Sequence, residues 1–326
     1  MLSYSVVNKT GVILLNLGGP DSLKSVRPFL YNLFSDRDII RLGPAPLQKP
    51  LAFLISLLRS KKSRDSYRLI GGFSPLRTIT EAQASSLEER LRPHGITVYT
   101  GMRYWHPFIE DTVEEIKRDR ITHLIALPLY PHYSIATSGS AIKKLEEVLR
   151  GAEIKLKIIK SWPDHPLYIR ALKENILKTL NTTEEPEKVH LLFSAHSLPV
   201  SFIEKGDPYV DELMKTINTL TSEIKLPWHL SYQSRSGPVK WLSPSTEEKL
   251  RELATHSVKE VIVVPVSFVS DHIETLYEID IYYRDIASGL GIKLYRTESL
   301  NTNSLFIDAL YNIVINALED SGWKGL

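Results

Sequence analysis

The sequence of 326 residues contains no cysteine. Disulfides, thiolate metal sites and cysteine-ligated iron–sulfur clusters are therefore excluded for these residues. An excess of charge is lacking too, because 40 Lys and Arg residues face 38 Asp and Glu residues, for a formal net charge of +2. Such a balance gives no electrostatic reason to expect nucleic acid as a ligand.

Long hydrophobic runs are also absent, and no apolar stretch approaches the length needed to cross a bilayer. The apolar run near the start leads into Gly18-Gly19-Pro20 without a basic beginning or a small-residue cleavage site. We therefore expect a first strand there and not a signal peptide. The apolar fraction of 43% and the charged fraction of 24% are typical of a soluble protein, and we expect a cytoplasmic location.

Apolar, β-branched runs of strand length alternate with amphipathic stretches of helix length, which predicts parallel sheets covered by helices. We predict an α/β protein of two similar halves, residues 1–165 and 166–326, each with a four-stranded parallel sheet flanked by helices. The last helix is expected to pack back across the junction. The expected strands are Val12–Leu17, Val98–Arg103, His123–Leu129, Leu156–Trp162, Val189–Ala195, Trp228–Gln233, Glu260–Phe268 and Ile292–Thr297.

The two halves can be overlaid as copies of each other. Pro107 falls on Pro244 and Pro128 falls on Pro265, and both pairs have the same offset in residue number, 137. The first strands of the halves match at a larger offset, which is 177. A register that holds over several elements predicts an internal duplication.

The first half carries extra residues after its first strand. Residues 29–64 contain the apolar runs FLYNLF and PLAFLISLL and then the basic run RSKKSR. An apolar segment flanked by Lys and Arg can cover an apolar ligand or rest on a membrane surface. An extra pair of helices packed on the domain is the simpler interpretation.

Two loops at the carboxyl ends of second-half strands concentrate reactive side chains. His196 lies in FSAHSLPVSFIEKGDPY, and FVSDHIETLYEID offers Asp271, His272, Glu274 and Glu278. Because parallel strands end at one edge of their sheet, both loops can face one crevice. A neutral imidazole opposite a carboxylate suits divalent first-row metals, Fe(II) included. Glu274 and Glu278, at i and i+4, share a face of a helix.

These residues also have structural interpretations. A lone histidine at a strand end more often bonds to a loop than binds a metal. Asp271 and Glu274 have the spacing of a helix capping box, with Asp271 as the N-cap. Aromatic residues that follow predicted strands could either pack at the rim or wall a flat apolar macrocycle; they are Tyr104, Trp105, Tyr130, Tyr133 and Trp241.

These motifs resemble those of a known family. SAHSLP followed by GDPY resembles the ferrochelatase signature, and so do GVILLNLGGPDS, RYWHP, YPHYS, WLSPST and SDHIETLYEID, in the expected order from about residue 12 to residue 310. The resemblance implies two Rossmann-like, chelatase-type halves around a porphyrin cleft. It also implies a lyase that inserts Fe(II) into protoporphyrin IX as the terminal step of haem biosynthesis, with no permanent cofactor.

The resemblance implies roles for single residues as well. His196 and Glu274 match the chelating, metal-binding pair, with Glu278 and Asp271 as further acidic catalytic residues. The segment at about 29–70 resembles the family's pocket lip, which contacts the membrane in some members. The implied partners are protoporphyrin IX and ferrous iron. The implied substrate-binding residues are Leu17, Arg103, Tyr104, Tyr130, Ser134, Trp241 and His272.

Three features depart from parts of the family. Tyr282 stands where some relatives have another carboxylate. The cysteine-bearing C-terminal extension of animal members has no counterpart, so no iron–sulfur cluster is expected. Leu17 stands where a Gram-positive branch that uses coproporphyrin has Tyr, which favours protoporphyrin. The alternatives are a cobalt chelatase or coproporphyrin ferrochelatase of the same fold, or a non-catalytic porphyrin- or haem-binding protein.

Overall fold

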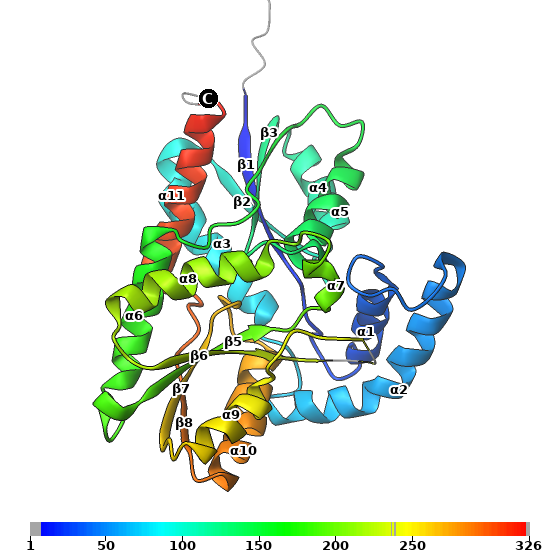
Figure 1. Ribbon diagram of the computed structural model, residues 1–326. Helices are drawn as coiled ribbons and strands as arrows, with labels where there is room; N and C mark the ends of the chain where they lie inside the picture. The colour runs from blue at the N-terminus through cyan, green and yellow to red at the C-terminus, as the bar shows by residue number, and fades with distance from the viewer. Residues whose placement is uncertain (1–7, 236, 238, 324–326) are drawn as a thin grey trace, which may run out of the picture.

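The chain folds into two α/β halves, each built on a four-stranded sheet in which every pairing is parallel (Figure 1). The computed structural model describes residues 8–235, 237 and 239–323. The strand orders are β2-β1-β3-β4 and β6-β5-β7-β8. The predicted fold class is therefore confirmed. Residues 1–7, where the signal-peptide question arises, and 324–326 lie outside the described residues.

All eight predicted strands are present. The largest difference between a predicted and an observed strand end is at β4, which ends four residues before the predicted limit at Trp162. β7 ends three residues before its predicted limit at Phe268. At β7 the reason is a turn, in which the N–H of Phe268 donates to the carbonyl of Pro265. The strands are β1 Thr10–Asn16, β2 Thr97–Met102, β3 His123–Pro128, β4 Lys155–Ile158, β5 His190–His196, β6 Trp228–Gln233, β7 Glu260–Pro265 and β8 Lys293–Arg296.

Helices cover the faces of both sheets (Figure 1), as the long apolar runs of the buried strands require. The α-helices are α1 Val26–Ser35, α2 Gln48–Leu69, α3 Leu76–Leu91, α4 Ile109–Arg118, α5 Ser140–Leu149, α6 Pro166–Leu180, α7 Val200–Ile203, α8 Tyr209–Glu223, α9 Thr246–Thr255, α10 Arg284–Gly289 and α11 Ser304–Asp320. Two π-helical segments, η3 Ile135–Gly139 and η5 Glu274–Tyr283, follow the third strand of each half.

The sheet register shows how the halves correspond. Leu15 lies opposite Pro128, and Ser194 lies opposite Pro265 in the same way. The prolines keep the offset of 137, while the first strands have an offset of 179, so the predicted offset of 177 is wrong by two. A buried apolar strand looks alike after a shift by two, because its side chains alternate with period two. His196 is therefore the counterpart of Leu17.

The extra residues of the first half form a helix pair. Helices α1 and α2 pack against each other and project from the body of the molecule, at the right of Figure 1. This arrangement agrees with the simpler interpretation of the insertion. The last helix, α11, packs on α6 and also on α3 and β3 of the first half. Among the described residues, none of the helices combines the length and the apolar character needed to cross a membrane.

Candidate functional site

A cavity of about 190 Å³ lies between the two halves, where the loops after β1, β3, β5 and β7 meet. This is the edge of the sheets at which open α/β proteins bind ligands. Apolar side chains of the first half, Leu17, Leu33, Ile39 and Leu129, form one side of the lining. The predicted site residues that line the cavity are Leu17, Tyr130, His196, Trp241, His272 and Glu274.

The last residue of β5 is His196, and its backbone is fixed on both sides. Its N–H donates to Ser267 Oγ at 2.9 Å, and its carbonyl accepts from the Tyr209 hydroxyl at 3.0 Å. Its Nδ1 lies 2.8 Å from Glu274 Oε2. The side chains of His196 and Glu274 are 34% and 15% exposed, so the imidazole still reaches the cavity.

Burial would lower the pKa of His196 and raise that of Glu274, but the attraction between the two groups outweighs it. The pKa of His196 is therefore raised and that of Glu274 is lowered. The two groups thus favour an imidazolium–carboxylate ion pair. Because Nδ1 is committed to Glu274, the Nε2 atom is the one left to act on a ligand, and no hydrogen bond involves it within the described residues.

A single hydroxyl joins Glu274 to Glu278. Ser234 Oγ lies 2.7 Å from Oε2 of Glu274 and 2.6 Å from Oε2 of Glu278. Gln233 Nε2 also donates to Glu278 Oε2, at 3.2 Å. Burial, and then the charge of Glu274, raise the pKa of Glu278 to about 7. A carboxyl that is half protonated near neutral pH is suited to exchange protons.

The structure rules out the capping-box interpretation of Asp271 and Glu274. The backbone N–H of Asp271 donates to Asn301 Oδ1, while the Glu274 carboxylate accepts from His196 and Ser234. Asp271 belongs to a separate network, because its carboxylate accepts hydrogen bonds from Thr275, Arg296, Ser299 and Asn301. Asp271 thus braces the start of η5 and does not join the Glu274–Glu278 pair.

Three of the predicted substrate-binding residues do not line the cavity. Arg103 and the buried Tyr104 both donate to Asp36 Oδ2, at 2.7 and 2.6 Å. Ser134 is fully buried and donates to Asp207 Oδ2 at 2.9 Å. Their binding roles stay predictions from the family resemblance.

Of the remaining lining residues, His272 and Trp241 offer polar atoms. The Nδ1 of His272 lies 3.0 Å from the Ser270 carbonyl, and because a carbonyl can only accept, Nδ1 carries the proton. Burial lowers the pKa of His272, which keeps the ring neutral with a lone pair on Nε2. The indole Nε1–H of Trp241 is buried and has no partner within the described residues, so it is available to a bound ligand.

The sequence analysis missed the residues that hold His196 and Glu274 in place. They are Ser234, Ser267 and Tyr209. Ser234 directly follows β6 and Ser267 follows β7 by two residues, so both stand at the same sheet edge as His196. The rule that ligands bind at the carboxyl ends of strands could have identified these two serines. Tyr209, at the start of α8, could not be identified in this way, because its hydrogen bond to the His196 carbonyl has no signal in the sequence.

Comparisons with known proteins identify the family of the chain. The family model described as Ferrochelatase matches residues 9–318. The chain is 51% identical to the ferrochelatase of Gloeothece citriformis, with 97% of this chain and 84% of that protein covered. It is 50% identical to the ferrochelatase of a Synechocystis species, with 96% and 84% covered.

The chain belongs to the ferrochelatase family. The resemblance seen in the sequence motifs is thereby confirmed, as is the prediction of a metal-chelating enzyme of haem biosynthesis. Because this ferrochelatase-family chain has no cysteine in its 326 residues, they cannot ligate an iron–sulfur cluster through thiolates.

Solved structures of other chelatases share the fold of this ferrochelatase-family chain. SirB from Bacillus subtilis with Fe3+ aligns with a TM-score of 0.57 at 12% identity, covering 97% of this chain and 98% of that one. CbiX, described as the terminal enzyme for biosynthesis of siroheme in denitrifying bacteria, aligns with a TM-score of 0.54 at 13% identity, covering 95% and 100%. At such identities the likeness concerns the fold alone.

Proposed function

We propose that this protein is a lyase that inserts ferrous iron into protoporphyrin IX and releases two protons, the terminal step of haem biosynthesis. The observation that carries the proposal is the His196–Glu274 pair, which faces an apolar wall across the cavity between the halves. Iron is a substrate here, as is the macrocycle. The cytoplasm is the proposed location, and the division at residues 165 and 166 is the proposed domain boundary.

His196 acts first, on the centre of the ring. Metal insertion requires that two pyrrole N–H protons leave and that the cation reach four inward-facing nitrogens. In its neutral form, with the proton on Nδ1, the imidazole offers a lone pair on Nε2 that can accept a pyrrole proton or bind Fe(II). The raised pKa of His196 makes this nitrogen a stronger base than a free imidazole. Glu274 steadies the imidazolium that results, because its carboxylate lies 2.8 Å from Nδ1.

Glu274, Ser234 and Glu278 then form a path along which a proton can leave. The hydroxyl of Ser234 has one proton and two carboxylates within 2.7 Å, so it donates to one of them at a time. When Glu274 is protonated and Glu278 is ionised, Glu274 can donate to Ser234 Oγ while Ser234 donates to Glu278. Transfer of both protons along these bonds moves one proton from Glu274 to Glu278 and leaves the hydroxyl as it was. We propose a positioning role for Asp271, which is tied to Arg296.

The apolar wall has a separate task. A planar porphyrin hides the nitrogen lone pairs from an approaching cation, and a cleft that holds the ring bent exposes them, with the strain supplied by contacts at the ring's edges. Leu17, Leu33 and Leu129 offer such contacts to an apolar edge. A porphyrin carrying vinyl groups suits this wall better than one carrying further carboxylates. Protoporphyrin is therefore the proposed substrate in preference to coproporphyrin.

The test is the visible spectrum of the protein mixed with protoporphyrin IX and Fe(II) under anaerobic conditions. Conversion of the porphyrin spectrum to that of haem, at a rate that grows with protein concentration, is the expected result. A porphyrin-bound spectrum with no conversion would identify a binding protein instead. The same assay with Co(II) separates a cobalt chelatase, which would metallate faster with cobalt than with iron.

We further propose that α2 makes peripheral contact with a membrane. Between Gln48 and Ser60, the residues that α2 buries are small or polar and spaced by four, namely Gln48, Ala52, Ser56 and Ser60; farther along it buries Ser66 and Tyr67. Four large apolar residues of the same stretch are exposed instead, namely Phe53, Leu54, Leu57 and Leu58. A helix in water shows the reverse arrangement.

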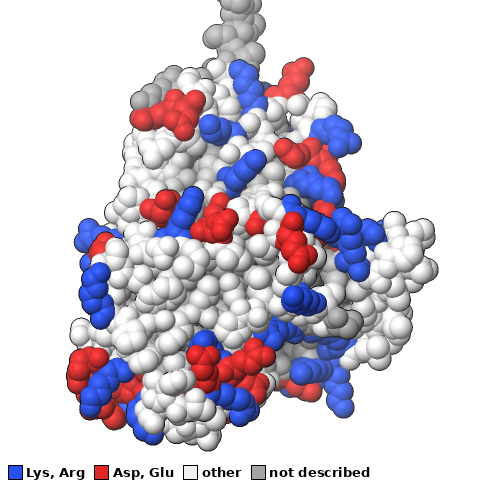
Figure 2. All heavy atoms as spheres, in the orientation of Figure 1, with Lys and Arg blue, Asp and Glu red and all other residues white. Residues whose placement is uncertain are grey.

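The surroundings of α2 support this proposal. Figure 2 shows white surface at the outer end of the α1–α2 projection and groups of Lys and Arg side chains beside it. Apolar side chains that enter the interface, flanked by basic residues, are typical of peripheral helices. The double change Leu57→Ser and Leu58→Ser should abolish flotation with vesicles.

A further inference from the structure

A hollow of about 720 Å³ lies between α1 and α2. It shares no lining residue with the cavity around His196. One side comes from α1 and the turn before it, and the other side comes from α2. Its lining residues are Leu23, Lys24, Arg27, Pro28, Tyr31, Phe53, Ser56, Arg64 and Arg68.

Four of these nine lining residues are cations, and none is acidic. Within the described residues only Arg68 has an ion-pair partner, the neighbouring Asp65. The Nε–H of Arg64 is buried and makes no hydrogen bond within the described residues. The guanidinium of Arg27 stacks over the ring of Phe53, 4.7 Å from its centroid, and Arg27 has no ion-pair partner within the described residues. Unpaired guanidinium groups that converge on one hollow are suited to a phosphate.

The rest of the lining is apolar, which a free phosphate would not need. Leu23, Pro28 and Phe53 give the hollow an apolar floor beside its cations. Phe53 is also 52% exposed and belongs to the outward apolar face of α2. The hollow is therefore continuous with the surface that we propose to touch a membrane. A ligand that fits both parts carries an anionic phosphate joined to an apolar chain.

We propose that the groove between α1 and α2 binds one anionic phospholipid, with the headgroup phosphate held by Arg27, Arg64 and Lys24 and the chain lying along Phe53. This inference rests on the proposed membrane contact and adds a headgroup preference to it. Apolar insertion alone brings α2 to any bilayer. The groove makes the contact selective for anionic lipid and fixes how the helix pair sits on the surface.

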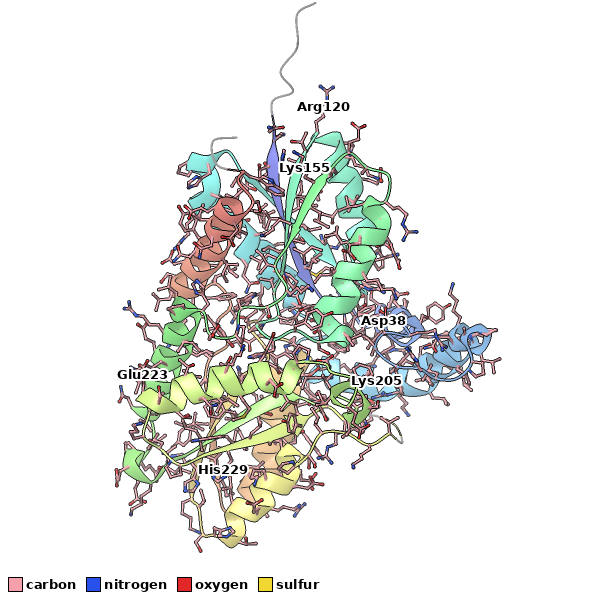
Figure 3. The ribbon with its side chains drawn as sticks, turned by 45° about the horizontal axis from the view of Figure 1, so that its top comes forward. Asp38, Arg120, Lys155, Lys205, Glu223 and His229 are labelled. Atoms are coloured by element: carbon pink, nitrogen blue, oxygen red, sulfur yellow. The ribbon has the colours of Figure 1, made fainter. Side chains whose placement is uncertain are left out.

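The test compares matched variants on vesicles. Arg27→Gln with Arg64→Gln removes two groove cations, and Arg120→Gln with Lys155→Gln removes two cations at the top of the molecule in Figure 3, apart from the blue α1–α2 pair. Binding is measured on phosphatidylcholine vesicles with and without about one-third phosphatidylglycerol. The groove variant should lose at least about tenfold in affinity for anionic vesicles and little for neutral ones. The control variant should stay within about twofold on both.

Diffuse attraction to a charged surface is separated from a site by a second titration, with monomeric dihexanoyl-phosphatidylglycerol and with inorganic phosphate. The site predicts saturable binding of the lipid with one molecule per chain, lost in the groove variant, and weaker binding of phosphate. Phosphate bound as tightly as the lipid would point to a free-anion site and overturn the proposal. Lys24→Gln, on an exposed side chain, serves if the double variant is unstable.

The outcomes separate the two proposals. Equal binding to neutral and anionic vesicles, with no titration by the short-chain lipid, overturns the headgroup site and leaves the membrane contact standing. No binding to either kind of vesicle overturns both. Loss of flotation in Leu57→Ser with Leu58→Ser, together with retained binding of the short-chain lipid, would support both.

Discussion

The two halves of the molecule share one architecture and differ where they face each other. The sheet register makes Leu17 the counterpart of His196. Nine residues after the matched prolines, Thr137 stands in the first half where Glu274 stands in the second. All four line the same cavity. Two halves of one architecture thus present an unreactive wall on one side of the cavity and, on the other, the wall with the residues that we propose to chelate iron.

A third position, that of Glu278, differs between the halves in the same way. At the offset of 137, Glu278 corresponds to Ala141, which is buried in the apolar core of the first half. The π-helical segment is five residues long in the first half and ten in the second. Irregular helices of this kind are frequent at functional sites. The first half thus folds without these charges and without the longer segment, which agrees with the catalytic role that we propose for them.

The strongest test of the difference between the two halves is His196→Leu, which gives the second half the residue that the first half has at this position, Leu17. We expect insertion to fall by roughly a thousandfold or more, about 4 kcal/mol in the barrier, because the base and ligand are lost. Porphyrin binding, followed by fluorescence quenching, should survive on the enlarged apolar wall.

The control for this variant is His229→Leu, at the other end of β6 from Ser234 (His229 is labelled in Figure 3). The ring of His229 stacks on that of His190. It should retain activity. If His196→Leu keeps activity within about tenfold, His196 is not the chelating residue.

Glu274→Gln is the next largest change. Gln keeps the shape and its amide N–H can meet the imidazole, so folding should survive while insertion falls by about a hundredfold. Since Glu274 raises the pKa of His196, the variant should show a lower His196 pKa by NMR. An unchanged turnover combined with a lowered Tm would make Glu274 a structural residue.

Much of this arrangement could be predicted from the sequence, and the failures have physical causes. The buried strands could be predicted because they are apolar runs of strand length. The loop motifs that follow two of them predicted that His196 and Glu274 lie at one sheet edge. The capping-box pattern of Asp271 and Glu274 suggested a structural role that the fold does not realise. Asp271 instead forms hydrogen bonds with Asn301 and Arg296, which are distant in sequence. The predicted offset between the first strands of the two halves was wrong by two residues because an alternating apolar pattern looks the same after a shift by two.

Glu278→Gln tests the third position through stability. The folded-state pKa of Glu278 is about 7, above the ordinary value of 4.5. A carboxyl whose pKa is raised by folding contributes stability below its unfolded pKa and loses it as the pH rises through the folded value. Between pH 4.5 and 7, wild-type stability should therefore fall relative to Glu278→Gln, by about 3 kcal/mol in all.

Denaturant unfolding of both proteins at pH 5 and pH 8 measures this difference. The free energy of unfolding of the variant minus that of the wild type should increase from pH 5 to pH 8, because only the wild type must then hold a second carboxylate beside Glu274. If this difference in unfolding free energy is the same at both pH values, the pKa of Glu278 is not raised, and Glu278 is not the proton acceptor of the path through Ser234.

The smallest expected effect concerns which porphyrin the unreactive wall accepts. Coproporphyrin carries two propionates where protoporphyrin carries two vinyl groups. Leu17, Leu33 and Leu129 offer no partner to a carboxylate, and burying one unpaired costs several kcal/mol. Part of that cost is avoided if a propionate turns toward water, so we expect kcat/KM to favour protoporphyrin by about tenfold or more.

Side-by-side kinetics with both porphyrins measure this preference, and Leu17→Tyr sharpens the result. A hydroxyl placed on the apolar wall gives an added propionate a hydrogen-bond donor, so the preference should shrink in the variant while His196 and Glu274 still act. The basic residues of α2 are the alternative source of such a partner. Equal efficiencies in the wild type would mean that they reach the propionates, and the selectivity would then belong to the helix pair and not to the wall opposite the chelating residues.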